Sequence, residues 1–164
     1  MAITRTGKAK ELFEKAVELS TPPNFENDKA IKLFTEVINL LPNDDESYAG
    51  RGGCYTLIGE LDKSVEDESK AIALNPTEPT YYANRRYNYA WLGEIEKAVA
   101  DAEKEIELSG KEQAARIYYA LASDIEQATG DTDQALVYYK KSADHGGFKG
   151  SKDYTKEALA RLGK

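Results

Sequence analysis

The chain repeats itself with a period of 34 residues, and this feature constrains its fold more than any other. When the sequence is shifted by 34 positions, residues 47–76 fall into register with residues 81–110. The identities that recur are Tyr48, Ala49, Arg51, Tyr55, Gly59, Glu60, Lys63, Val65, Asp67, Lys70, Ile72 and Leu74, matched by Tyr82, Ala83, Arg85, Tyr89, Gly93, Glu94, Lys97, Val99, Asp101, Lys104, Ile106 and Leu108. A chain with such a period is expected to stack copies of one small structural unit.

Each copy has the pattern of two helices joined by a turn. Apolar residues recur at steps of three and four, which is the spacing of one helix face. Gly59 and Gly93 lie between the two runs, where a residue that tolerates positive φ is needed. Asn75-Pro76 follows the second run, and proline cannot continue a helix.

Two segments of each copy resemble the tetratricopeptide repeat, a helix–turn–helix unit of 34 residues. The Tyr-x-Asn-Arg-Gly motif of one variety of that family is similar to residues 48–52, Tyr-Ala-Gly-Arg-Gly, and to residues 82–86, Tyr-Ala-Asn-Arg-Arg. Residues 70–76, Lys-Ala-Ile-Ala-Leu-Asn-Pro, are similar to the end of the family's second helix. The resemblance implies a chain of stacked helical hairpins.

The flanking segments extend the resemblance over almost the whole chain. We predict an all-α fold, a right-handed superhelical solenoid of about four such hairpins in a single domain spanning 1–164. The predicted repeats are 9–42, 45–76, 79–110 and 113–145, followed by a capping helix at 152–162 that covers the last apolar face. The linker 20–25 departs from the usual tight turn and is expected to be longer.

Composition argues against several classes of function. The chain carries 29 acidic and 22 basic residues, a net charge of -7, so a nucleic-acid partner is not expected. One cysteine, Cys54, and one histidine, His145, leave no disulfide, no thiolate metal site and little scope for histidine catalysis. We expect no cofactor, no metal, no membrane insertion and no enzymatic activity; a cytoplasmic location is favoured if the chain is full length.

The charged residues that recur between the copies predict structural ion pairs. Arg51 and Asp67 lie sixteen residues apart, one on each helix of a repeat, and Arg85 and Asp101 repeat the arrangement. Each pair is expected to bridge its hairpin. Arg86 stands where the preceding copy has Gly52, and we expect it to reach past Ala102 towards Glu105 or Glu68.

The first helix of each repeat is expected to line a concave groove that receives a peptide or helix of a partner protein. The residues predicted to contact the partner are Gly53, Leu57, Asn84, Tyr87, Trp91, Leu121 and Asp124. Tyr87, Trp91 and Leu57 would supply apolar anchors, and Asp124 with Glu46 an acidic edge that favours an apolar or mildly basic peptide. Two alternatives stay open: the aromatic residues pack between neighbouring repeats, or the chain is a structural module that assembles with copies of itself.

Overall fold

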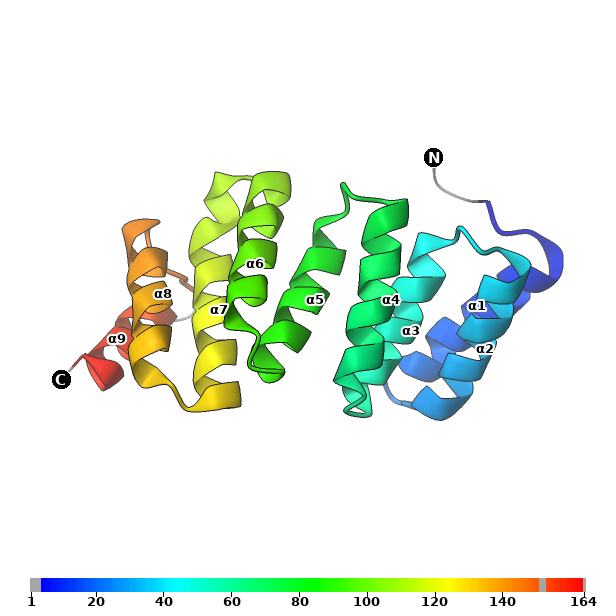
Figure 1. Cartoon of the computed structure of the whole chain (residues 1–164), viewed down its shortest axis with the longest axis horizontal. Helices are drawn as coiled ribbons and strands as arrows, with labels where there is room; N and C mark the ends of the chain where they lie inside the picture. The colour runs from blue at the N-terminus through cyan, green and yellow to red at the C-terminus, as the bar shows by residue number, and fades with distance from the viewer. Residues whose placement is uncertain (1–3, 151–152, 164) are drawn as a thin grey trace. The chain divides into compact units, whose positions relative to one another are not determined.

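The computed structural model describes residues 4–150 and 153–163, and within these residues the chain is helical (Figure 1). The α-helices there are α1 (Gly7–Ser20), α2 (Asn27–Leu40), α3 (Asp45–Leu57), α4 (Leu61–Leu74), α5 (Pro79–Trp91), α6 (Ile95–Ser109), α7 (Ala114–Thr129), α8 (Thr132–Asp144) and α9 (Tyr154–Leu162). One turn of 3-10 helix at Lys111–Gln113 precedes α7, and Lys149 and Asp153 form an isolated β-bridge. The predicted all-α fold class is confirmed.

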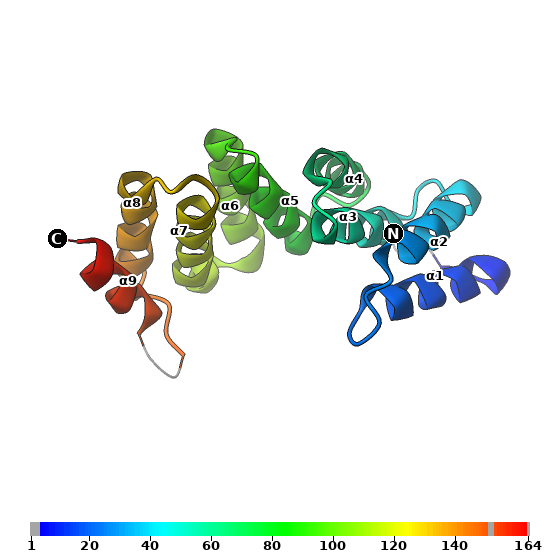
Figure 2. The same cartoon turned by 90° about the horizontal axis from the view of Figure 1, so that it is seen from below.

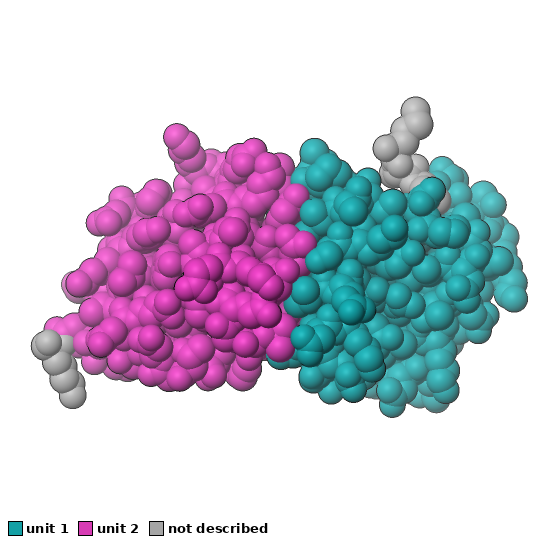
Figure 3. Space-filling view, viewed as in Figure 1, with its two compact units in different colours: residues 1–81 teal, residues 82–164 magenta. Residues whose placement is uncertain are grey.

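The chain divides into two compact units, residues 1–81 and 82–164, which Figure 3 shows in different colours. The boundary falls near the start of α5, inside the third predicted hairpin. Each unit has an apolar cluster of its own. The single domain expected from the sequence stays a prediction.

Unit 1 contains two helical hairpins, α1–α2 and α3–α4, and α2 also packs against α3 (Figure 2). Its apolar cluster contains Ala16, Leu19, Ala30, Phe34 and Cys54. The Phe34 ring fits closely against α3 because residue 50 is glycine: a Cβ there would lie 2.6 Å from Phe34 Cζ. The hairpins of this unit are therefore held by small residues opposite one large ring.

Unit 2 packs α6 against α7, α7 against α8, and α8 against α9. Its core is a single cluster of buried residues: Ala90, Ile95, Ala98, Ala102, Ile117, Leu121, Ala122, Ile125, Ala135, Tyr139 and Ala158. The last member lies on α9, which covers the end of the core as the predicted cap should. Lys152, the first residue of that predicted helix, lies outside the described residues.

The turns inside the hairpins follow the sequence pattern. Gly59, Gly93 and Gly130 have φ values of 81°, 75° and 72°, a left-handed conformation that favours glycine. The turn of the first hairpin is longer, as expected, and carries Phe25 at a φ of 45°. A non-glycine residue in this region is uncommon, and an aromatic one especially so.

Candidate functional site

One face of α5 carries three exposed residues at steps of three and four, Asn84, Tyr87 and Trp91. We call these three residues the α5 face. The side chains of Tyr87 and Trp91 are 37% and 41% exposed, and their ring centroids lie 5.9 Å apart at an angle of 41°. Two large rings that pack against each other yet remain accessible form the kind of anchor that protein partners use.

The buried side of α5 holds Arg86, which joins three helices of unit 2. Its Nε lies 3.3 Å from Glu105 Oε2 on α6, and its Nη1 donates to Asp124 Oδ2 on α7. Arg116 Nη2 also lies 3.4 Å from Glu105 Oε1. The prediction that Arg86 reaches Glu105 is confirmed, whereas the contact with Asp124 was missed because the two residues are 38 positions apart in the sequence.

Asp124 therefore has a different role from the one predicted. The sequence placed it on an acidic edge of the groove, but its carboxylate is largely buried and paired with Arg86. Burial raises the pKa of Asp124 more than the neighbouring guanidinium of Arg86 lowers it. Burial also raises the pKa of Tyr87, and the negative charge of Asp124 raises it further.

The second residue of the predicted acidic edge, Glu46, is also paired. Its Oε2 lies 2.9 Å from Arg5 Nη2. The same nitrogen also pairs with the buried carboxylate of Asp44. Glu46 remains exposed beside this arginine, so its place at an acidic edge stays a prediction, whereas Asp124 is largely buried against Arg86. The Arg5 guanidinium also stacks on the Phe13 ring, 3.5 Å from its centroid.

Leu121 was predicted to contact a partner and is instead fully buried in the core of unit 2. The assignment failed because α7 packs against both α6 and α8, so the helix face chosen from the repeat register points into the core. An apolar residue with no exposed surface is unable to contact a second protein. The prediction for Leu121 is wrong.

Gly53 and Leu57 lie on α3, in unit 1. Leu57 is 59% exposed, and a Cβ added at Gly53 would meet open space, with no contact within 4 Å. Both positions thus remain accessible on their own unit. They correspond by the 34-residue offset to Tyr87 and Trp91 on α5.

Both predicted hairpin ion pairs are present. Arg51 Nε and Nη2 each lie 2.8 Å from an oxygen of Asp67, and Arg85 makes the same two contacts with Asp101. The hydrogen bond to the carboxylate raises the pKa of each arginine. These four residues are largely buried, so their geometry fits a structural role rather than contact with a partner.

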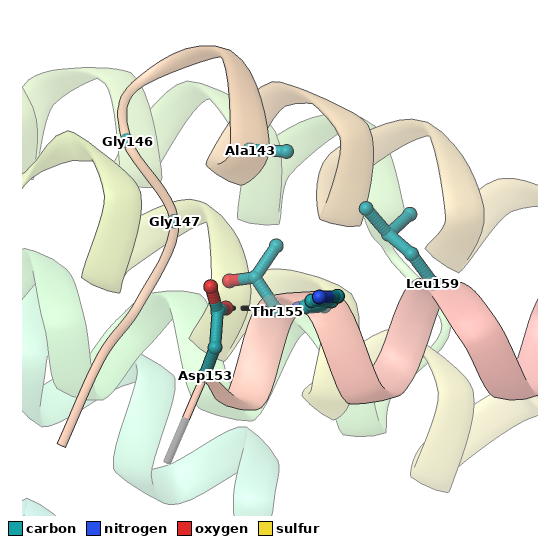
Figure 4. Close-up of a pocket in the computed structure, with 7 residues that line it drawn as sticks. Ala143, Gly146, Gly147, Asp153, Thr155 and Leu159 are labelled. Atoms are coloured by element: carbon teal, nitrogen blue, oxygen red, sulfur yellow. Dashed lines mark hydrogen bonds between the residues drawn. The ribbon is translucent and has the colours of Figure 1, made fainter. Parts of the chain in front are cut away.

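The pocket in Figure 4, of about 270 Å³, lies where the end of α8 meets α9. Two of its polar side chains already have partners: Asp153 Oδ1 accepts from Lys156 N at 3.0 Å, and Thr155 Oγ1 accepts from Phe148 N at 2.7 Å. Thr155 and Ser142 also share a hydrogen bond of 2.9 Å. These contacts fasten α9 to α8, and we assign the pocket to the docking of the cap.

The remaining reactive groups are few. Cys54 is buried, and burial raises the pKa of its thiol to about 11, which keeps it protonated and unreactive at neutral pH. In the part of the chain that the structure describes, no three acidic, histidine or cysteine side chains gather as a metal site would require. Within the same residues, every helix is too short or too polar to span a bilayer.

Helical hairpins with a shared register, glycine turns and bridging ion pairs are the features of a helical repeat fold. Comparisons with known proteins bear on which kind of repeat this is. The family model of the tetratricopeptide repeat matches residues 115–144. This is the fourth repeat, not the second or third, in which the sequence motif is most evident. No curated protein matches the chain.

Several solved structures share the fold. A crystal structure of MamA aligns with a TM-score of 0.71 at 21% identity, covering 94% of this chain and 90% of that one. The first tetratricopeptide domain of Spaghetti (RPAP3), bound to the HSP90 peptide SRMEEVD, gives 0.64 at 22%, with coverages of 79% and 94%. YrrB, described as having an unusual peptide-binding site, gives 0.66 at 15%, with coverages of 84% and 68%. At these identities the likeness shows the fold alone, and the family model adds that residues 115–144 match a tetratricopeptide repeat.

Proposed function

We propose that this protein is a scaffold that binds a segment of a partner protein, and that the α5 face is its principal anchor. The observation that carries the proposal is the exposed pair of Tyr87 and Trp91, whose rings contact each other on the surface of unit 2. Aromatic residues dominate the binding energy of many interfaces because they bury a large area with few rotatable bonds.

The packing beneath this face supports the proposal. Arg86, adjacent to Tyr87 in sequence, is held by Glu105 and Asp124 from two other helices. This network fixes α5 relative to α6 and α7, so the two rings are presented on a rigid support. A rigid anchor loses less conformational entropy on binding than a mobile one.

The structural neighbours are consistent with such a role. The Spaghetti domain is bound to a peptide, and YrrB is described as having a peptide-binding site. The lysines and asparagine that some members of the family use to clamp a carboxylate-ended peptide are not all present here: of the matching positions only Asn84 fits. The partner segment is therefore not expected to be held through such a clamp, and apolar anchoring by Tyr87 and Trp91 takes its place.

The proposal is tested by Trp91→Ala and Tyr87→Ala, with Val137→Ala as a matched control for an exposed apolar residue on another helix. Partners captured from a lysate of the source organism with the natural chain are purified and titrated against each variant. Each aromatic variant should lose about 1–3 kcal/mol of binding free energy while the control loses almost none. Equal affinity for all three variants, with folding intact, contradicts the proposal.

The alternative from the sequence, assembly of the chain with copies of itself, has its own measurement. Light scattering over a range of concentrations gives the molar mass in solution. A mass that rises with concentration, and returns to that of one chain in the Trp91→Ala variant, identifies a second copy as the occupant of the α5 face. A constant monomer mass removes this alternative.

A further inference from the structure

We propose that unit 1 contains an arginine-binding site at the start of α3, filled in this structure by the chain's own Arg5, and that an arginine from a basic segment of a partner protein takes the place of Arg5. The site consists of Phe13, Asp44 and Glu46, and we call these three residues the arginine site. It lies within unit 1, so the inference does not depend on the proposed function of the α5 face.

Arg5 shows how the arginine site holds a guanidinium. Its Nε donates to Asp44 Oδ2 at 2.8 Å and its Nη2 donates to Asp44 Oδ1 at 2.6 Å, a paired geometry that lysine is unable to reproduce. The same Nη2 lies 2.9 Å from Glu46 Oε2, and the Cζ of Arg5 lies 3.5 Å from the centroid of the Phe13 ring. Two carboxylates and one aromatic ring therefore surround a single guanidinium.

Asp44 is not explained by the needs of its own helix. It occupies the N-cap position of α3, yet its side chain makes no capping hydrogen bond to the backbone of that helix. Its buried carboxylate accepts instead from Arg5 and from the Ser47 hydroxyl. At the equivalent position 34 residues later, Glu78 Oε1 accepts from the backbone and the hydroxyl of Thr80 within its own turn. Asp44 is thus oriented towards a guanidinium and not towards its helix.

The helix dipole opposes a cation at the start of a helix, and here the carboxylates outweigh it. The N-cap and first turn of α3 carry three acidic residues, Asp44, Asp45 and Glu46. Together they exceed the roughly half positive charge of a helix N-terminus. The position of Arg5 shows the result directly, since a guanidinium is seated there with its side chain only 14% exposed.

The site is fixed, whereas the residue that fills it lies on an exposed segment. The Phe13 ring packs against Phe34, with ring centroids 5.7 Å apart, and Asp44 is held by the Ser47 hydroxyl. The residues on either side of Arg5 are both exposed, so this arginine reaches the site through its side chain. A second arginine is therefore able to compete with Arg5 for a preorganised site.

A neighbouring pocket indicates the rest of the ligand. This pocket of about 440 Å³ shares Glu46 with the arginine site, and Asp45 and Glu78 add two further carboxylates to its walls. None of the described residues that line it is basic. The negative potential of such a pocket attracts positive charge. The ligand that fits both features is a segment in which further basic residues flank the arginine.

The test is an NMR titration of the natural chain and of the Arg5→Ala variant with two short peptides. The first is Gly-Lys-Arg-Lys-Gly, and the second has citrulline in place of arginine, which keeps the shape and removes the charge. The arginine peptide should shift the Phe13 ring and Glu46 amide signals of Arg5→Ala in a saturable manner. The citrulline peptide should bind this variant at least about tenfold more weakly. The natural chain should bind the arginine peptide about tenfold more weakly than the variant does, because Arg5 competes for the site.

Matched variants separate binding from folding, which circular dichroism checks for each. Adding Asp44→Asn to Arg5→Ala should weaken binding of the arginine peptide about tenfold, because the paired hydrogen bonds are lost. Arg116→Ala removes a half-exposed arginine from unit 2 and should bind no more tightly than the natural chain. If Arg5→Ala does not fold, Arg5→Lys replaces it: lysine keeps the charge without the paired geometry, so this variant should also bind the peptide more tightly than the natural chain.

Three results overturn the inference: no shift at Phe13 and Glu46 up to the solubility limit of the peptide, equal binding of the citrulline peptide, or equal binding by the natural chain and the Arg5 variant. Movement of the Trp91 signal in place of these two also overturns it, and assigns the peptide to the α5 face. A molar mass that rises with concentration in the natural chain and stays constant in Arg5→Ala overturns it as well, because the occupant is then Arg5 of a second copy. A negative result at the arginine site leaves the proposed function of the α5 face untouched.

Discussion

The second and third repeats share their hairpin ion pair and differ at the residue beside it. Arg51–Asp67 and Arg85–Asp101 have the same two contacts of 2.8 Å, but Gly52 of the second repeat is replaced by Arg86 in the third. On the second helix of each hairpin the facing residue is large in the second repeat and small in the third. A Cβ at Gly52 would lie 3.2 Å from Glu68 Oε1, whereas the residue corresponding to Glu68 in the third repeat is Ala102.

This comparison shows how a repeat changes its side-chain contacts without losing its fold. The space between the two helices is filled by one small and one large side chain, whichever helix carries the large one, because packing constrains their combined volume. Of these two repeats, the third gains a buried cation, Arg86, which binds carboxylates on two further helices. The three residues of the α5 face are also larger than those of the second repeat: Asn84, Tyr87 and Trp91 replace Gly50, Gly53 and Leu57.

The largest expected effect is that of restoring the second repeat's glycine in the third. Arg86→Gly leaves the buried Glu105 and Asp124 without their shared cation, and should destabilise the protein by roughly 3–5 kcal/mol. Urea unfolding monitored by circular dichroism gives the value. Arg116→Ala is the control, because Arg116 is half exposed and should contribute less than about 1 kcal/mol. A loss below that of the control would show that the network is unimportant.

The hairpin ion pairs come next. Arg51→Ala should lower the free energy of unfolding by roughly 2–3 kcal/mol, less than for a fully buried pair, because it strands Asp67. The double variant Arg51→Ala with Asp67→Ala should be more stable than Arg51→Ala alone, since no buried charge is then left unpaired. The same cycle on Arg85 and Asp101 should give a similar coupling energy. If the stability losses of the two single variants add up to that of the double variant in either repeat, the two charges are not coupled and the ion-pair account is contradicted.

Two glycine substitutions in α3 should change the stability by less, and in opposite directions. Gly50→Ala places a Cβ 2.6 Å from the Phe34 ring and should destabilise the protein by roughly 1–3 kcal/mol. Gly53→Ala meets open space and should stabilise it by about 0.5–1 kcal/mol through helix propensity. Thermal unfolding of both variants gives the comparison. A destabilising Gly53→Ala would mean that the space beyond Gly53 is needed by the fold.

The smallest effect concerns the cap. The hydrogen bond from Arg161 is the main reason that the pKa of Glu126 is lowered from 4.5, and the Tyr139 hydroxyl also donates to this carboxylate. A lowered pKa in the folded state means that this stabilisation is complete above the unfolded-state pKa and is lost as pH falls through the folded one. Because the pair is exposed, Arg161→Ala should cost at most about 1 kcal/mol at pH 7. The variant and the natural chain should become equally stable in acid, which unfolding at pH 7 and at pH 3 compares; an unchanged gap at pH 3 would contradict the assignment.

The sequence predicted the parts of this structure that repeat. The helical hairpins, the glycine turns and both hairpin ion pairs follow from residues that recur at a fixed offset, because a recurring residue has a recurring environment. Arg86 could be assigned to Glu105 on the same grounds, since the departure at Ala102 lies on the same helix. In each of these cases the interacting residues belong to one hairpin.

The sequence failed where packing between hairpins decides the environment. Leu121 is buried and Asp124 is paired because α7 lies between its neighbours, and neither position has a counterpart in the motif that would reveal it.

The most direct test of the central claim uses the single tryptophan of the chain, Trp91, as a reporter of the α5 face. Its fluorescence is quenched with acrylamide, first alone and then with a saturating amount of the purified partner. Binding at the α5 face should shift the emission to shorter wavelength and lower the quenching constant several-fold, because the partner covers the exposed indole. A partner that binds fully while Trp91 remains as accessible as before would contradict the account.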